Sequence, residues 1–317
     1  MQPKITRIAL ATLLLALFAA PTVPAQTKLA HPEALVDAEW LRDNFNAPDT
    51  VIIDASDHKD DTYQSKTIKS AVFVPYRDLR KPSGLMKGIV YNLEKQAFNP
   101  DPLRQIFRKA GVNKTSTVVV VAQYRLDDAG MVFWALKWLG HDDVRLLPVN
   151  YLEVLPEQML TDRIIRWDHN DKKGNFTPLP DWSWYATRDD VIEAIDSPFV
   201  DIWDLRSESY FKGKKTKTIR GGTVATARNW FFMNAWKDKT ASEIDWQLVD
   251  NELSELFPNP GSADRKVKII SLCNTGHVSG AGFLAWQMGH QWALCDASWN
   301  FFAYDGELPV DNIVFHD

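Results

Sequence analysis

The chain passes twice through the same order of short apolar runs and helical patterns. The first pass covers residues 51–54, 70–75, 103–110, 117–121, 129–139 and 144–147. The second pass covers residues 199–204, 221–224, 244–256, 267–272, 279–288 and 292–295. A Gly-His pair ends the corresponding helical pattern in each pass, as Gly140-His141 and Gly289-His290. The repetition predicts a tandem duplication, in which residues 199–204 correspond to 51–54 and residues 221–224 correspond to 70–75.

This alternation also predicts the fold class. Strands that alternate with helices form mostly parallel sheets flanked by helices. The length of 317 residues suits two such α/β domains. We therefore expect a first domain over residues 26–160 and a second over residues 184–317. Residues 161–183 are rich in Asp, Pro, Lys and Gly without periodicity, and we expect them to form the linker.

Residues 1–25 have the pattern of a secretory signal peptide. Lys4 and Arg7 precede an apolar stretch over residues 8–20, and Ala25 is a small residue ahead of a cleavage point. The stretch is shorter than the ~20 residues that a membrane-spanning helix needs. We expect a periplasmic protein with no membrane contact after cleavage.

Charge restricts the partners of the mature chain. Loss of Lys4 and Arg7 takes the formal net charge from −5 to −7, so no basic surface for nucleic acid is expected. The sequence predicts a small-molecule partner or another periplasmic protein.

The segment around Cys273 carries the clearest chemical signal. The apolar run 267–272 stops at this cysteine, and a polar loop leads into the next helical pattern. Backbone N–H groups of such a loop can turn toward one point and form an anion site, called a nest. A nest favours the thiolate form of a cysteine, so Cys273 is the candidate nucleophile. The candidate substrate-binding residues are those of the loop, Asn274, Thr275, Gly276, His277, Val278 and Ser279.

Two of the loop residues have more than one interpretation. His277 is suited to tuning the thiolate or contacting an anionic donor, or only to packing in the loop. Ser279 is first a candidate helix N-cap and second a donor to a bound anion. Gly276 gives the loop the conformational freedom that a tight nest needs.

The other cysteine, Cys295, leaves a further question open. The chain has only two cysteines, too few for a disulfide framework. Cys273 and Cys295 could pair with each other, or act as a redox couple, although no Cys-x-x-Cys is present. The seven histidines show no spacing suited to a metal site, and we expect no metal and no organic cofactor.

Several motifs in the second half occur in a familiar order. They are Asp204-Leu205-Arg206 with Tyr210 and Gly213, Ile219-Arg220-Gly221-Gly222, the Cys273 loop, Gly289-His290 and Asp296-Ala297-Ser298-Trp299. This order resembles the rhodanese family of sulfurtransferases. The tandem arrangement is similar to that of its two-domain thiosulfate and 3-mercaptopyruvate sulfurtransferases. The likeness covers essentially all of the chain after residue 25, more strongly in the second half than in the first.

The resemblance implies a fold and an activity. It implies two tandem rhodanese-like domains, the first of them without a nucleophile because Ala122-Gln123-Tyr124 stands where the second has its cysteine. It also implies that the Cys273 thiolate takes the sulfane sulfur of a donor such as thiosulfate as a persulfide. A thiol or cyanide acceptor then removes that sulfur.

Two departures from the family pattern matter for the substrate. Thr218 stands where a histidine often precedes the Ile-x-Gly segment. Thiosulfate enzymes of the family usually carry a basic residue soon after the cysteine, and this chain has Asn274 and Thr275 there. The identity of the donor therefore stays open at this stage.

Other functions remain as alternatives. One is a non-catalytic or sulfur-carrier module that serves a protein partner, and another is a thiol redox protein that uses Cys273 and Cys295. A cysteine-dependent phosphatase would need an arginine six positions after the nucleophile to hold phosphate. Ser279 occupies that position, which argues against a phosphatase.

Overall fold

The computed structural model describes residues 27–56, 66–79, 91–92, 97–98, 100–123, 125–162, 173–237, 243–258 and 267–315. The expected signal peptide, residues 1–25, lies outside the described residues, as does Tyr124. Among the helices of the described ranges, none is long and apolar enough to cross a membrane.

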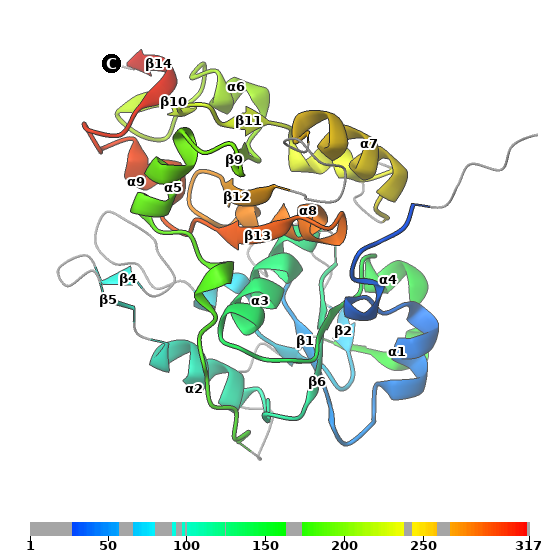
Figure 1. The fold of residues 1–317 in the computed structure, drawn as a ribbon. Coiled ribbons are helices and arrows are strands. Elements are labelled where there is room, and N and C mark those ends of the chain that lie inside the picture. The colour runs from blue at the N-terminus through cyan, green and yellow to red at the C-terminus, as the bar shows by residue number, and fades with distance from the viewer. Residues whose placement is uncertain are drawn as a thin grey trace, which may run out of the picture.

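Two four-stranded parallel sheets form the centre of the structure (Figure 1). The first has the order β3-β1-β6-β7, with β1 at Thr50–Asp54, β3 at Val72–Phe73, β6 at Thr117–Val121 and β7 at Val144–Leu146. The second has the order β11-β9-β12-β13, with β9 at Val200–Asp204, β11 at Arg228–Asn229, β12 at Lys268–Leu272 and β13 at Gln291–Leu294. The equal topologies confirm the predicted duplication and its fold class.

The helices follow the same repetition. The first half contains α1 (Ala38–Asn44), α2 (Asp101–Lys109), α3 (Leu126–Trp138) and α4 (Tyr151–Val154). The second half contains α5 (Arg188–Ile195), α6 (Glu208–Phe211), α7 (Trp246–Leu256), α8 (Phe283–Gln287) and α9 (Ser298–Phe302). Short 3-10 helices complete the set, η1 (Pro32–Ala34), η2 (Tyr76–Leu79), η3 (Glu157–Met159), η4 (Trp182–Trp184), η5 (Phe232–Ala235) and η6 (Val278–Gly282).

The paired Gly-His signals mark equivalent helix ends. Gly140 and Gly289 have φ angles of 78° and 90°, in the left-handed region that a glycine after a helix adopts without steric cost. Each glycine allows the chain to leave its helix and enter the last strand of its parallel sheet, β7 or β13.

Three sequence predictions need correction. Residues 221–224 belong to β10 (Arg220–Val224), which pairs antiparallel with β14 (Val310–Phe315) and not with the parallel sheet. Its counterpart in the first half is β2 (Lys66–Ile68), which pairs with β8 (Leu160–Asp162). The counterpart of residues 70–75 is instead β11. Short apolar runs give the same signal in either kind of sheet, so periodicity could not separate them.

The helix expected over residues 279–288 is divided into η6 and α8. Most residues of both segments are buried. Gly280 lies against the backbone of α3, and Gly282 lies against the Trp292 ring. The ends of the expected linker also carry regular structure, since Thr161 lies in β8 and Trp182 opens η4. The limits of the two domains otherwise stay predictions. One further strand pair, β4 (Tyr91–Asn92) with β5 (Ala97–Phe98), lies in the first half.

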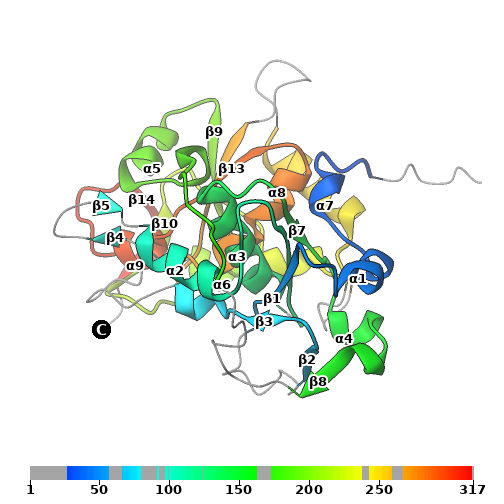
Figure 2. The same ribbon diagram turned by 90° about the horizontal axis from the view of Figure 1, so that it is seen from below.

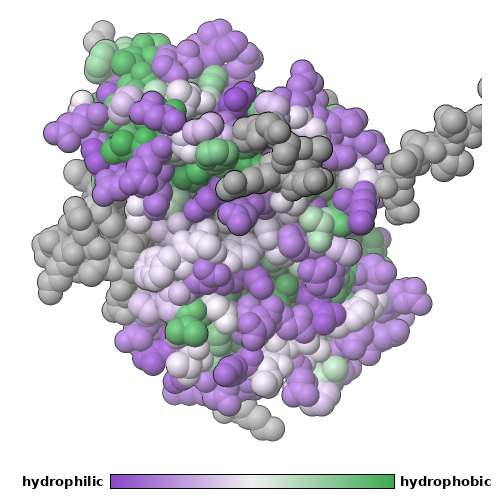
Figure 3. All heavy atoms as spheres, viewed as in Figure 1, coloured by the Kyte–Doolittle hydropathy of each residue, from purple (hydrophilic) through white to green (hydrophobic). Residues whose placement is uncertain are grey.

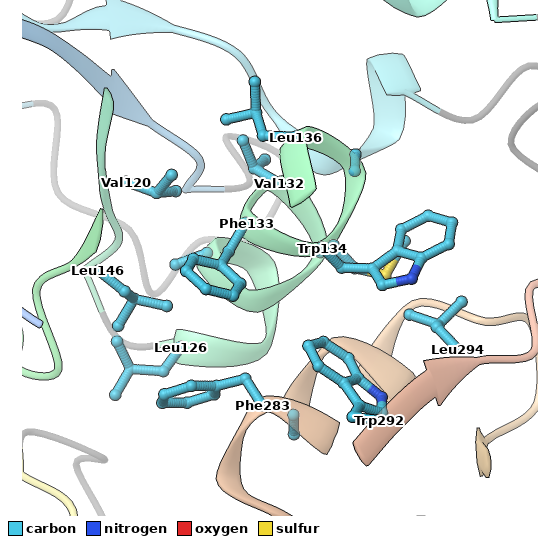
Figure 4. Close-up of a cluster of buried hydrophobic side chains, with 14 of the residues drawn as sticks. Val120, Leu126, Val132, Phe133, Trp134, Leu136, Leu146, Phe283, Trp292 and Leu294 are labelled. Carbon is cyan, nitrogen blue, oxygen red and sulfur yellow. The ribbon is translucent and has the colours of Figure 1, made fainter. Parts of the chain in front are cut away.

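One hydrophobic core joins the two halves. Residues of α3 pack with α8 and β13, as Figure 4 shows for Phe133, Trp134, Phe283 and Trp292. Nearly every residue of α3 is buried, which is typical of a helix enclosed on all sides. Figure 2 shows α3 and α8 as neighbours in a second view. The surface in Figure 3 is mostly polar, as expected of a chain with 24% charged residues.

Candidate active site

Cys273 follows β12 directly, at the carboxyl edge of the second parallel sheet. Its backbone N–H donates to the Ser298 hydroxyl at 3.1 Å, and its carbonyl accepts from the Trp299 N–H at 2.9 Å. Ser298 has a φ of 51°, so this turn is a strained one for a residue other than glycine. The cysteine is only 2% exposed. It is therefore held rigidly and is almost covered.

The loop after Cys273 leaves backbone donors unused. Within the described part of the chain, the N–H groups of Asn274, Gly276 and His277 have no hydrogen-bond acceptor. Gly276 has a φ of 81°, and a Cβ there would lie 2.5 Å from the carbonyl oxygen of Asp296. Only glycine fits that position without strain. Unpaired N–H groups beside a cysteine are what a nest for a sulfur anion requires.

A buried ion pair between Arg206 and Asp204 holds the loop in place. Arg206 binds Asp204 through Nε at 2.9 Å and Nη2 at 2.5 Å, and both side chains are buried. The third guanidinium nitrogen, Nη1, donates to the Asn274 side-chain oxygen at 3.3 Å. The Trp299 ring lies 5.1 Å from the guanidinium carbon, in cation–π geometry. Arg206 thus fixes the turn and the loop.

His277 points out of its own domain toward the first half of the chain. Its Nε2–H donates to Asp128 Oδ1 at 2.5 Å and lies 3.5 Å from Asp127 Oδ2. Its ring stacks on Tyr76 of η2, with centroids 3.5 Å apart. The packing interpretation of His277 is therefore satisfied, and a cross-domain hydrogen bond accompanies it.

Asp127 and Asp128 were not predicted as site residues from the sequence. Both are buried at the start of α3. Burial opposes the ionisation of Asp127, but the charge and hydrogen bonds of Arg125 hold the pKa of its carboxyl below the usual value. Burial raises the pKa of Asp128, although its hydrogen bond from His277 acts in the opposite direction.

These residues also bear on metal binding. Within the described ranges, Asp127, Asp128 and His277 form the one group whose donor atoms lie close enough to hold an ion. Each already has a partner, however, because Arg125 binds both oxygens of Asp127 at 3.1 and 2.6 Å and His277 binds Asp128. The group is an ion-pair network rather than a vacant ligand set.

Ser279 does not cap a helix. It lies inside η6, whose N-cap position is His277, and no side chain caps that end. The N-cap hypothesis for Ser279 is therefore wrong. Its Oγ is buried and has no hydrogen-bond partner within the described residues. Val278 opens η6 and packs against the common core, and Thr275 lies in the preceding loop.

The two cysteines are free and lie in different environments. Cys295 follows β13 and is completely buried. Burial raises its pKa to about 12, so at neutral pH it is a neutral thiol that packs as a small hydrophobic group. This environment argues against a redox couple of Cys273 and Cys295.

The equivalent place in the first half is filled. By strand register, Ala122 occupies the position of Cys273. Beside it, the Gln123 amide donates to the Tyr151 hydroxyl at 2.9 Å, and that hydroxyl donates to Asp54 at 2.9 Å. Ser56 stands where the second half has Arg206. The first copy therefore lacks both the thiol and the arginine that supports the loop.

Comparison with known proteins agrees with this geometry. Residues 37–151 match the family model described as "Rhodanese-like domain". A protein named "Putative thiosulfate sulfurtransferase" from Mycolicibacterium smegmatis is 25% identical over 298 residues, which cover 89% of this chain and 99% of that protein. Residues 37–151 of this chain therefore carry a rhodanese-like domain. The model matches the half that lacks the cysteine, which was the half with the weaker sequence likeness.

Solved structures extend the comparison to both rhodanese-like halves. SseA from Escherichia coli, described with the rhodanese fold of 3-mercaptopyruvate sulfotransferases, has a TM-score of 0.66 at 20% identity and covers 84% of this chain and 98% of its own. An anaerobic ergothioneine biosynthesis enzyme from Chlorobium limicola has a TM-score of 0.71 at 17% identity, covering 89% of this chain and 71% of its own. At these identities the likeness establishes the tandem rhodanese fold.

Proposed function

We propose that this protein is a sulfurtransferase in which Cys273 carries a sulfane sulfur as a persulfide. The observation that supports it most is the loop beside Cys273, where backbone N–H groups have no acceptor in the described structure. An anion held there would gain hydrogen bonds that cost no reorganisation. A thiolate and a persulfide are both such anions.

The proposed reaction has two nucleophilic steps. The Cys273 thiolate attacks the outer sulfur of the donor, the donor's bond to that sulfur breaks, and the bonding pair leaves with the remainder of the donor. The persulfide then presents its outer sulfur to an acceptor thiolate or cyanide, and the S–S bond breaks to return the Cys273 thiolate. Sulfur changes carrier without any added oxidant or reductant.

The donor class follows from the relatives and from the loop. Thiosulfate and 3-mercaptopyruvate are named for proteins similar to this chain, and both are anions. Free N–H groups at Asn274, Gly276 and His277 would receive either of them without a lysine or arginine in the loop. We propose thiosulfate as the donor to test first, and export to the periplasm as the setting of the reaction.

A turnover assay tests the proposal. The purified protein is given thiosulfate or 3-mercaptopyruvate with cyanide, and thiocyanate is measured. Cys273→Ala should abolish turnover, while Cys295→Ala, which removes the neutral buried thiol, should retain it. If the wild-type chain is inactive with both donors, the sulfur-carrier alternative with a protein donor gains support. If Cys273→Ala remains active, the proposal fails.

A further inference from the structure

The contact of His277 with the first domain fixes which ring nitrogen can act. Nε2 is bound to Asp128 at 2.5 Å, and the ring is stacked on Tyr76. Nδ1 has no hydrogen-bond partner within the described residues, and the side chain is 15% exposed. With the proton on Nε2, held by Asp128, Nδ1 carries a lone pair that can accept a proton, in a partly exposed side chain four residues after Cys273.

The charges around the His277 imidazole bear on whether it binds an anion or accepts a proton. An anion-binding role would need a net positive cluster. Here, Arg125 is paired with Asp127 at 2.6 Å, and a protonated His277 would be paired with Asp128. The positive and negative charges cancel, so the cluster offers little net attraction to an anionic donor. A carboxylate behind an imidazole is instead the arrangement that orients the ring and stabilises it when it accepts a proton.

We propose that His277, oriented by Asp128 from the other domain, is the general base that deprotonates the acceptor thiol. This rests on the proposed sulfur transfer at Cys273. His277 Nδ1 takes the proton of the thiol, and the resulting thiolate attacks the outer sulfur of the Cys273 persulfide. The S–S bond to Cys273 breaks, and its electron pair returns to the cysteine as thiolate. The imidazolium then gives its proton to the product persulfide or to water.

The proposal assigns different roles to the two residues. His277 is a catalytic residue because it contacts the acceptor, whereas Asp128 is a positioning residue that acts through it. Among the described residues, the charged and titratable groups that face the His277 ring are Asp127 and Asp128, with Arg125 behind Asp127, and the Tyr76 phenol ring of η2. The site is therefore complete only when both halves of the chain are docked.

The two half-reactions can be separated experimentally. Wild type, His277→Gln and Asp128→Asn are loaded with thiosulfate and then mixed with dithiothreitol or with sulfite, and persulfide loss is followed by quenched intact mass. Sulfite has no proton to lose at pH 8, so it needs no base. His31→Gln is the matched control, since it removes another imidazole stacked on an aromatic ring, Trp286, outside the loop.

The proposal gives a specific pattern of rates. Discharge to dithiothreitol at neutral pH should fall by about 10²- to 10⁴-fold in His277→Gln, whereas loading and discharge to sulfite, which need no base, should fall far less. Asp128→Asn should show a smaller loss in the dithiothreitol arm. Raising the pH should restore the variants, because the free thiolate then forms without a base.

Two results would overturn the proposal. One is an equal loss with sulfite and dithiothreitol, which would mean that His277 only supports the loop. The other is an unchanged rate with dithiothreitol. If wild type takes no sulfur from thiosulfate or 3-mercaptopyruvate, the proposed donors are wrong, and the discharge arms are then run on protein loaded with inorganic polysulfide. Failure of the donor and failure of the base are thus distinguished.

Discussion

The two halves of the chain pack backbone against backbone at two glycines, so Gly130→Ala should push them apart. Gly130 lies in α3, and Gly280 lies in η6 beside the Cys273 loop. A Cβ at Gly130 would lie 2.3 Å from the carbonyl oxygen of Gly280 and 2.8 Å from its carbonyl carbon, whereas ordinary contacts begin at 3.4 Å. The backbones must therefore part by about 1 Å.

Two opposing effects set the magnitude. Alanine is favoured over glycine inside a helix by about 1 kcal/mol. Forcing an extra carbon into a packed interior costs about 1–3 kcal/mol. Here the cost should reach the upper end, because both sides of the contact are backbone and no side chain can rotate away. The free energy of unfolding should fall by about 2 kcal/mol.

Urea unfolding followed by tryptophan fluorescence measures this change. The matched control is Gly306→Ala, because Gly306 is exposed and a Cβ there meets nothing within 4 Å. That control should stay within about 0.5 kcal/mol of wild type. The same shift of α3 should lengthen the bond between Asp128 and His277 and slow sulfur discharge to thiols. If Gly130→Ala is as stable as Gly306→Ala, the packing argument is refuted.

Three further predictions concern buried groups. Asp204→Asn leaves Arg206 buried beside a neutral partner, so the free energy of unfolding should fall by about 3–5 kcal/mol in urea titrations, and a loss below 1 kcal/mol would contradict the assignment. The unfolded chain should release the Cys295 proton near pH 9.0, and the folded chain retains it to about pH 12. Wild-type stability should therefore fall by about 1.4 kcal/mol per pH unit more steeply than that of Cys295→Ala in this window, and parallel pH curves would refute the burial argument. The double variant Ala122→Cys, Cys273→Ala should take up no sulfur from thiosulfate by intact mass, because the first copy lacks the supporting arginine; a persulfide on residue 122 would contradict this.

Much of the fold was predictable because it depends on local patterns. The four valines of β6 and the run that ends at Cys273 predict buried strands, and both occupy interior positions in their parallel sheets. The position of the candidate nucleophile follows from the same pattern, since a polar loop after a buried strand lies at the sheet edge. The paired Gly140 and Gly289 identified the duplication because a helix end in the left-handed region strongly favours glycine.

The features that could not be predicted from the sequence depend on contacts between segments that lie far apart in the chain. Asp127 and Asp128 lie in the copy without a cysteine, at the start of an apolar helix, and only the contact of α3 with η6 brings them to His277. No local periodicity carries that information. The same holds for β10, whose partner β14 lies at the far end of the chain.

The central claim is that Cys273 holds the transferred sulfur. The most direct measurement is the intact mass of the reduced, mature protein before and after incubation with thiosulfate, followed by peptide mapping. The account predicts a gain of one sulfur atom, about 32 Da, on the peptide that contains Cys273, and its loss after a thiol is added. Sulfur on the Cys295 peptide, or no gain with thiosulfate, 3-mercaptopyruvate or polysulfide, would contradict it.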